Sequence, residues 1–120
     1  MTSRSIIHFE IPTLNANKSA EFYASLFEWE IIREEALDYT MFEPSEGPGG
    51  GFAKVPEEAA VGEINIFVQS PDIESDLTRV EQLGGKIISH KTEIPGVGWF
   101  GQFFDPTGNK ISLYTSMRNP

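Results

Sequence analysis

The chain of 120 residues contains no cysteine. This absence excludes disulfide bonds, thiolate nucleophiles and cysteine-based zinc sites. A chain of this length buries about two-thirds of the surface that its unfolded form exposes, so it needs no cross-link to fold. Long apolar runs are also missing, because His8 and Glu10 interrupt the run that begins at Ile6. We therefore expect no signal-peptide core, no membrane span and a cytoplasmic location.

Basic residues are scarce. Nine lysines and arginines stand against 18 aspartates and glutamates, which gives a net charge of −9. An acidic chain repels phosphate backbones, so we expect no nucleic-acid partner. The acidic surface favours solubility, and it attracts cations, either metal ions or basic small molecules.

The chain does contain a regular alternation of apolar and polar residues. Ile7, Phe9 and Ile11 share one face of the first expected strand, and His8 and Glu10 share the other. Capping residues and stripes of apolar residues at helical spacing indicate two helices. The expected strands are 6–12, 29–34, 38–44, 50–55, 63–68, 86–90, 98–104 and 109–115, and the expected helices are 17–28 and 73–83.

The order β-α-β-β-β occurs twice, and the two halves can be aligned. The first strands match at an offset of 55, which places His8 over Glu63 and Glu10 over Asn65. Such an internal repeat predicts two similar modules. We expect one domain, 1–120, made of module one (5–54), a connector (55–62) and module two (63–118).

Four stretches carry a resemblance to a known family: "HFEIP", "SAEFYASLFEWE", "DIESDLTRVEQLGGKI" and "DPTGNKISLY". The chain resembles the vicinal oxygen chelate superfamily of glyoxalases, bleomycin-resistance proteins and extradiol dioxygenases. The stretch "IPGVGWFGQFFDPTGN" is similar to a glyoxalase-like subgroup with many members of unassigned activity. The resemblance implies an α+β fold whose two tandem βαβββ modules form a half-open, eight-stranded, barrel-like sheet with the helices outside. It also implies a small-molecule ligand on the concave face and a homodimer.

The resemblance further implies one divalent metal as cofactor, held by the first and fourth strands of each module. His8 and Glu63 fall on two of these positions, but Ser112 stands where a carboxylate is usual, and a neutral serine is a poor ligand. The glycine-rich fourth strand supplies no ligand in either register. His8 is either a ligand or an interior histidine with satisfied hydrogen bonds, and Glu63 is either a ligand or a surface acid. We expect neither a standard glyoxalase I nor the dioxygenase ligand set.

Glu10 leaves three interpretations open. It lies about 7 Å along the strand from His8, on the same face. His8, Glu10 and Glu63 could form a rebuilt metal site. Alternatively, Glu10 is a buried acid with a raised pKa that acts as a general base or binds a cation without a metal. In the third interpretation, His8 and Glu10 form a hydrogen-bonded pair that only satisfies polar groups.

Further residues are expected to line the pocket. Tyr114 shares the parity of Ser112, and Trp99 follows a glycine-containing loop, although core packing suits Trp99 equally well. The glycines of 47–51 lack the lysine of a phosphate loop, so we expect them to allow a close backbone approach or a bend. The expected pocket residues are Asn65, Phe67, Trp99, Ser112 and Tyr114.

Three functions remain in competition. The first is a glyoxalase-like lyase or isomerase that acts on a carbonyl or diol substrate, with Glu10 as base. The second is a sequestering protein that binds its ligand in a metal-free acidic cavity without chemistry. The third is a structural or sensing domain that only keeps the fold. Fold cannot decide among them, because function depends on the site.

Overall fold

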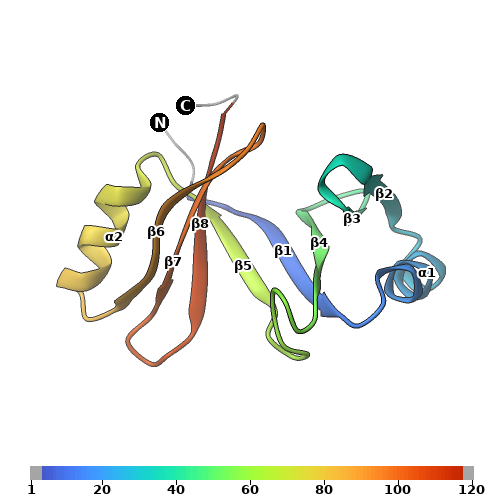
Figure 1. Ribbon diagram of the computed structural model, residues 1–120, viewed down its shortest axis with the longest axis horizontal. Coiled ribbons are helices and arrows are strands. Elements are labelled where there is room, and N and C mark those ends of the chain that lie inside the picture. Colours follow the sequence, from blue (N-terminus) through green and yellow to red (C-terminus); the bar gives the residue numbers. More distant parts are fainter. Residues whose placement is uncertain (1–3, 118–120) are drawn as a thin grey trace. The chain divides into compact units, whose positions relative to one another are not determined.

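The computed structural model describes residues 4–117. Its elements follow the order β-α-β-β-β twice, which confirms the predicted α+β fold of two tandem modules (Figure 1). The strands are β1 (Ile6–Thr13), β2 (Glu30–Glu34), β3 (Tyr39–Glu43), β4 (Gly49–Lys54), β5 (Asn65–Gln69), β6 (Lys86–Ile94), β7 (Gly98–Phe104) and β8 (Lys110–Ser116), and the helices are α1 (Ala16–Phe27) and α2 (Ile73–Gln82). Within residues 4–117, neither helix is long and apolar enough to cross a membrane.

The chain divides into two compact units. Among the described residues, one unit is His8–Asn65, and the other combines 4–7 with 66–117. Each division falls inside the first strand of a module, so each unit contains one helix and most of four strands.

In the unit His8–Asn65, the strands lie in the order β2-β3-β4-β1. β1 pairs with β4 in parallel, and the other pairs are antiparallel. The side chains of Ala20, Phe42 and Phe52 are buried and form the centre of an aromatic core between α1 and the strands. α1 begins after Asn15, whose side chain accepts a hydrogen bond from the amide of Lys18, as its capping position predicts.

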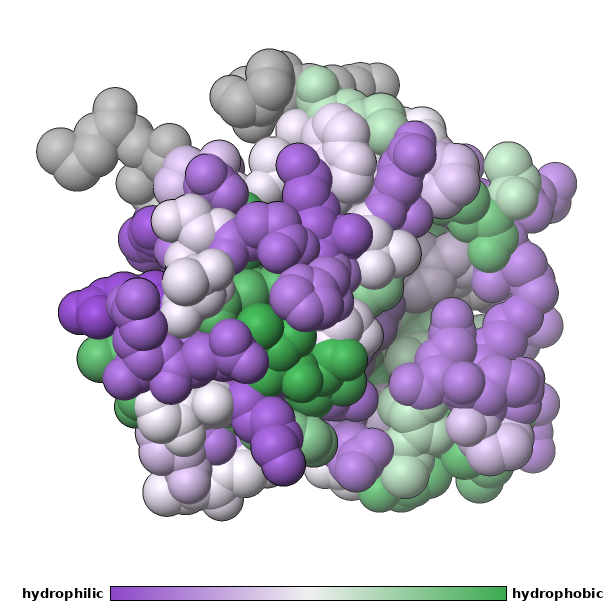
Figure 2. All heavy atoms as spheres, turned by 60° about the vertical axis from the view of Figure 1, so that its left-hand side comes forward, coloured by the Kyte–Doolittle hydropathy of each residue, from purple (hydrophilic) through white to green (hydrophobic). Residues whose placement is uncertain are grey.

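In the other unit, the strands lie in the order β5-β8-β7-β6, and α2 packs against β6 and β7. The side chain of Asp72 caps α2, and the backbone bonds of Gly84 and Gly85 to Glu81 and Val80 end it in a Schellman motif. Hydrophilic side chains cover much of the molecular face that Figure 2 turns toward the reader, on the side of α2.

Two strand boundaries differ from the prediction by two residues or more. β5 begins at Asn65 rather than at residue 63, because Glu63 and Ala60 close a turn with two mutual hydrogen bonds before the strand. β6 extends to Ile94, where its antiparallel pairing with β7 continues past two register shifts. Sequence patterning missed this extension because such irregularities interrupt the alternation of side chains.

Candidate functional site

The two faces of β1 differ in chemistry. Phe9 and Ile11 pack against the aromatic core. Alternation along the strand turns His8 and Glu10 to the opposite face, where both are partly buried. The histidine and the carboxylate that the sequence places side by side therefore lie on the face that does not carry the helix.

β4 lends this face no side chain beside His8 or Glu10. In the parallel pair, Gly49 lies opposite His8 and Gly51 lies opposite Glu10. Because Phe52 belongs to the core, Gly51 and Gly49 face away from the core. This register, which the sequence left open, places glycines opposite both His8 and Glu10.

Tyr39, the first residue of β3, fills the space that Gly51 leaves. Its hydroxyl lies 2.9 Å from Nε2 of His8 and donates a hydrogen bond of 2.7 Å to Oε2 of Glu10. A Cβ atom on Gly51 would stand 1.9 Å from this hydroxyl oxygen and 2.0 Å from Cζ of the ring. Tyr39 can occupy its position only because residue 51 has no side chain.

The side chains of His8, Tyr39 and Glu10 are linked by hydrogen bonds that run in one direction. A tyrosine hydroxyl has one proton, and Tyr39 donates it to Glu10. The contact with His8 then requires a proton on Nε2 of the imidazole, which donates to the tyrosine oxygen. The order is thus His8 Nε2–H to Tyr39 Oη–H to the carboxylate of Glu10.

Burial and charge set the protonation states. Burial lowers the pKa of His8, which keeps the imidazole neutral near pH 7. Burial also raises the pKa of Tyr39, and the charge of Glu10, its hydrogen bond and the charge of Glu58 raise it further. Tyr39 is therefore a protonated donor over the whole physiological range, held between a neutral imidazole and a carboxylate.

The residues present do not fit a divalent metal. The phenol oxygen of Tyr39 bridges His8 and Glu10 at hydrogen-bond distances and engages the Nε2 and Oε2 atoms that would bind an ion shared by them. Glu63 is exposed before β5, and its Oε1 accepts a hydrogen bond of 3.3 Å from the amide of Ala60. Among residues 4–117, no three histidine, aspartate or glutamate side chains come together as a possible metal site.

The other expected site residues are neutral. Asn65 is 8% exposed at the start of β5. Ser112 is fully buried opposite Phe67, and its Oγ accepts a hydrogen bond of 3.1 Å from the amide of Gln102. The hydroxyl of Tyr114, on the same face of β8, donates to the carbonyl of Val97 at 3.3 Å.

Trp99 does not share the face of Ser112 and Tyr114. Its ring packs against the core cluster of Ile73, Leu77 and Leu113, and the ammonium group of Lys91 lies 4.9 Å from the ring centroid. Trp99 therefore packs against the core, and its expected place in a pocket stays a prediction.

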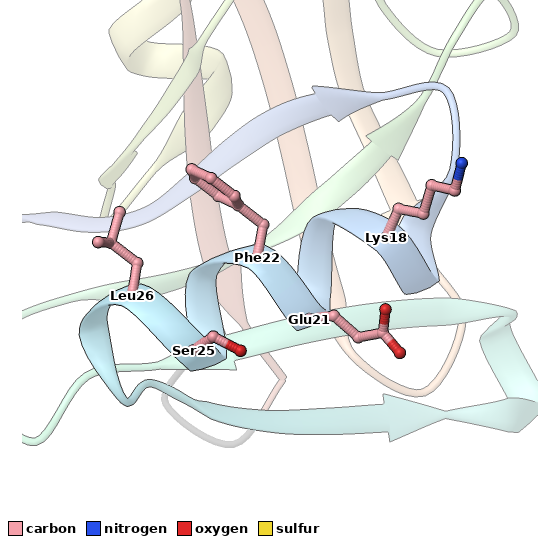
Figure 3. A pocket seen from close by; sticks show the side chains of 5 residues that line it. All are labelled: Lys18, Glu21, Phe22, Ser25 and Leu26. Atoms are coloured by element: carbon pink, nitrogen blue, oxygen red, sulfur yellow. The ribbon is translucent and has the colours of Figure 1, made fainter.

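A shallow surface hollow lies elsewhere, along the outer side of α1 (Figure 3). Phe22 and Leu26 form its apolar part and are more than half exposed. Lys18, Glu21 and Ser25 complete the lining. None of the residues expected in the site belongs to this hollow, and its side chains form no acid–base pair with a buried partner.

Comparisons with known proteins bear on the fold. The family model described as "Glyoxalase-like domain" matches residues 8–114. A comparison with curated proteins found no significant match. Among solved structures, a hypothetical protein from Bacillus halodurans C-125 is similar with a TM-score of 0.74 and 13% identity, and 94% of each chain is covered.

Two further solved structures carry functional names. A glyoxalase/bleomycin resistance protein/dioxygenase superfamily member from Vibrio splendidus 12B01 matches with a TM-score of 0.68 and 15% identity, over 93% of this chain and 98% of that one. Methylmalonyl-CoA epimerase from Mycobacterium tuberculosis matches with a TM-score of 0.73 and 14% identity, over 95% of this chain and 90% of that one. At such identities the likeness establishes the fold, and the site has to be judged by its own residues.

Proposed function

Because the chain belongs to the family of glyoxalase-like domains, we propose that it is a small-molecule isomerase or lyase that moves a proton beside a carbonyl group, with Glu10 as the base. One observation carries the proposal: the hydrogen-bonded chain from His8 through Tyr39 to Glu10 on the strand face opposite the core. These hydrogen-bonded side chains combine a carboxylate base with a protonated hydroxyl donor, which are the two groups that enolisation requires.

The proposed step begins at Glu10. Its carboxylate takes a proton from the carbon next to the substrate carbonyl, and the electron pair of the broken C–H bond moves to form an enolate. Once Glu10 is neutral, it attracts the proton of Tyr39 less strongly. The Tyr39 hydroxyl can then donate its hydrogen bond to the enolate oxygen, while Nε2–H of His8 holds the phenol in place.

The enolate has two outcomes. Where the α-carbon carries a hydroxyl group, return of the proton from Glu10 to the former carbonyl carbon, with transfer of the hydroxyl proton to the enolate oxygen, gives an isomer. Where the β-carbon carries a leaving group, the enolate re-forms the carbonyl and expels that group with its electron pair, which gives an elimination. A positioned general base contributes about 10²- to 10⁴-fold to the rate, and one donor to a developing oxyanion contributes about 10²- to 10³-fold. The high pKa of Tyr39 suits hydrogen bonding to the oxyanion, because the phenol keeps its proton.

Solvent exchange tests the proposal without knowledge of the natural substrate. Wild type, Glu10→Gln and Tyr39→Phe are incubated in D₂O, with EDTA present, with hydroxyacetone, 2-oxobutyrate and acetoacetyl-N-acetylcysteamine as probes. Proton NMR then follows exchange of the α-protons. We expect wild type to accelerate exchange of at least one probe, Glu10→Gln to lose at least 100-fold and Tyr39→Phe at least 10-fold. Equal exchange by wild type and Glu10→Gln would refute the role of Glu10.

A sequestering protein is the second proposal, and the acidity of the chain favours it. Glu10 would then attract a cationic or aromatic ligand that leaves unchanged. A thermal-shift screen with aromatic amines separates the two proposals. Stabilisation that Glu10→Gln abolishes, combined with no exchange of any carbonyl probe, would support binding alone. The predicted homodimer is a separate question, which light scattering coupled to gel filtration answers.

A further inference from the structure

The position of Tyr39 has a consequence that does not depend on catalysis by Glu10. We propose that the hydroxyl of Tyr39 takes the place of a divalent metal in this module and that Gly51 specifies the exchange. The residues that stand at this place do not fit the metal that the fold suggests.

The space between His8 and Glu10 is already occupied. Both side chains extend from β1 to the phenol oxygen of Tyr39, which lies 2.9 Å from Nε2 of His8 and 2.7 Å from Oε2 of Glu10. Zinc binds the lone pair of an imidazole nitrogen, and a nitrogen that donates its proton to the phenol oxygen has no free lone pair for a metal. A metal on Nε2 of His8 and its hydrogen bond to Tyr39 are therefore mutually exclusive.

Residue 51 determines whether the ring of Tyr39 can occupy this space. The missing Cβ of Gly51 would lie 1.9 Å from Oη, 2.0 Å from Cζ and 2.6 Å from Cε1 of Tyr39. Any side chain there would point at the place where His8 and Glu10 meet, and the tyrosine ring would have to leave. The residues at 39 and 51, on neighbouring strands, thus determine whether a hydroxyl bridges His8 and Glu10 or β4 supplies a third ligand.

The three groups already share their protons. Tyr39 donates a hydrogen bond to the carboxylate of Glu10, and the neutral imidazole of His8 donates one to the phenol oxygen. Metal binding at wild-type His8 and Glu10 would break both hydrogen bonds and expel a ring. This cost opposes the gain from two ligands, which form a weak site compared with the three or four of ordinary zinc proteins.

The test exchanges the two residues. Calorimetric titration with Zn²⁺, Mn²⁺ and Ni²⁺ is carried out on wild type and on Tyr39→Ala/Gly51→Asp, in which a short carboxylate replaces the phenol. We expect the double variant to bind one ion at least 100-fold more tightly than wild type. Adding His8→Ala to this background should abolish the gain, which excludes ions collected by surface carboxylates.

Tyr39→Phe is the matched control. Its ring carbons still fill the space beside Gly51, so it should gain no affinity although the hydroxyl is gone. If circular dichroism shows that the double variant does not fold, Tyr39→Ala alone should gain at least 10-fold over wild type. Micromolar binding by wild type that His8→Ala removes would overturn the proposal, as would a folded variant lacking the stated gain. The exchange experiment with carbonyl probes depends on neither result, so the two proposals can fail separately.

Discussion

Replacement of Gly51 by alanine should reveal how strongly this residue and Tyr39 depend on each other. The new Cβ would stand 1.9 Å from the hydroxyl oxygen and 2.0 Å from Cζ. Real Cβ atoms essentially never approach other heavy atoms below 3.0 Å, so the ring has to move. Because the contacts involve the rigid end of a tyrosine, rotation of a flexible chain cannot relieve them.

The cost follows from the two hydrogen bonds that the ring would lose. A bond to a charged carboxylate is worth about 1.5–3 kcal/mol and a neutral one about 0.5–1.5 kcal/mol. Gly51→Ala should therefore lower the free energy of unfolding by about 2–4 kcal/mol. In a Tyr39→Ala background the clash is absent, and the same substitution should cost less than about 1 kcal/mol.

Urea unfolding of the four proteins of this double-mutant cycle, followed by circular dichroism, measures the coupling. Gly50→Ala is the control. Its Cβ would stand 1.8 Å from the backbone oxygen of Phe9, so removal of the Tyr39 side chain does not relieve this clash. We expect a coupling energy above about 1 kcal/mol for Gly51 and near zero for Gly50. Equal costs of Gly51→Ala in both backgrounds would refute the argument that the two residues compete for one space.

Two further predictions concern protonation. Burial lowers the pKa of His8 below 6.5. Between the folded pKa and about 6.5, the unfolded chain therefore binds a proton that the folded chain does not. The free energy of unfolding should fall as the pH drops through this range. Urea unfolding from pH 8 to 5 should show that His8→Gln lacks this part of the loss, and His90→Gln, which removes the other, exposed histidine, should keep it. Hydrogen bonds from the backbone and side chain of Asn109, then from Thr107, lower the pKa of Asp105 to about 2. Asn109→Ala removes the side-chain bond and keeps the backbone N–H donor, so carbon-detected NMR should find this value rising part of the way toward 3.8, and an unchanged value would contradict the side-chain bonding in this turn.

Local signals in the sequence were enough to predict the order of the elements. Asn15 and Asp72 precede stripes of apolar residues at helical spacing, and both cap their helices. Asp72 was the predicted cap of its helix, whereas the sequence left Asn15 and Asn17 open for the first. The alternation in β1 correctly separated Phe9 and Ile11 from His8 and Glu10. These signals succeed because capping and alternation act over a few neighbouring residues.

Tyr39 was missed because its role depends on pairing between distant strands. β3 was predicted, but which of its residues would reach β1 depends on the registers of β3 with β4 and of β4 with β1. The glycine run was the available signal. Its interpretation as a place of close backbone approach fits Gly49 and Gly50, whereas Gly51 makes room for a ring.

The two repeats share the order of their helices and strands, but they do not share the side chains at the aligned site positions. Alignment of the first strands placed Glu63 over His8 and Asn65 over Glu10. Glu63 lies in a turn before β5, and Asn65 is a buried amide at the strand's first residue.

The face of β8 supplies a fully buried serine where the family resemblance suggests a carboxylate. A neutral serine that accepts a hydrogen bond from the amide of Gln102 has its polar group satisfied without any ion. The chain from His8 to Glu10 reaches the same result in the other module by using a phenol. Both modules thus satisfy their inner polar groups with protein hydrogen bonds. A variant meant to restore a metal must therefore remove an existing hydrogen-bond partner as well as add a ligand.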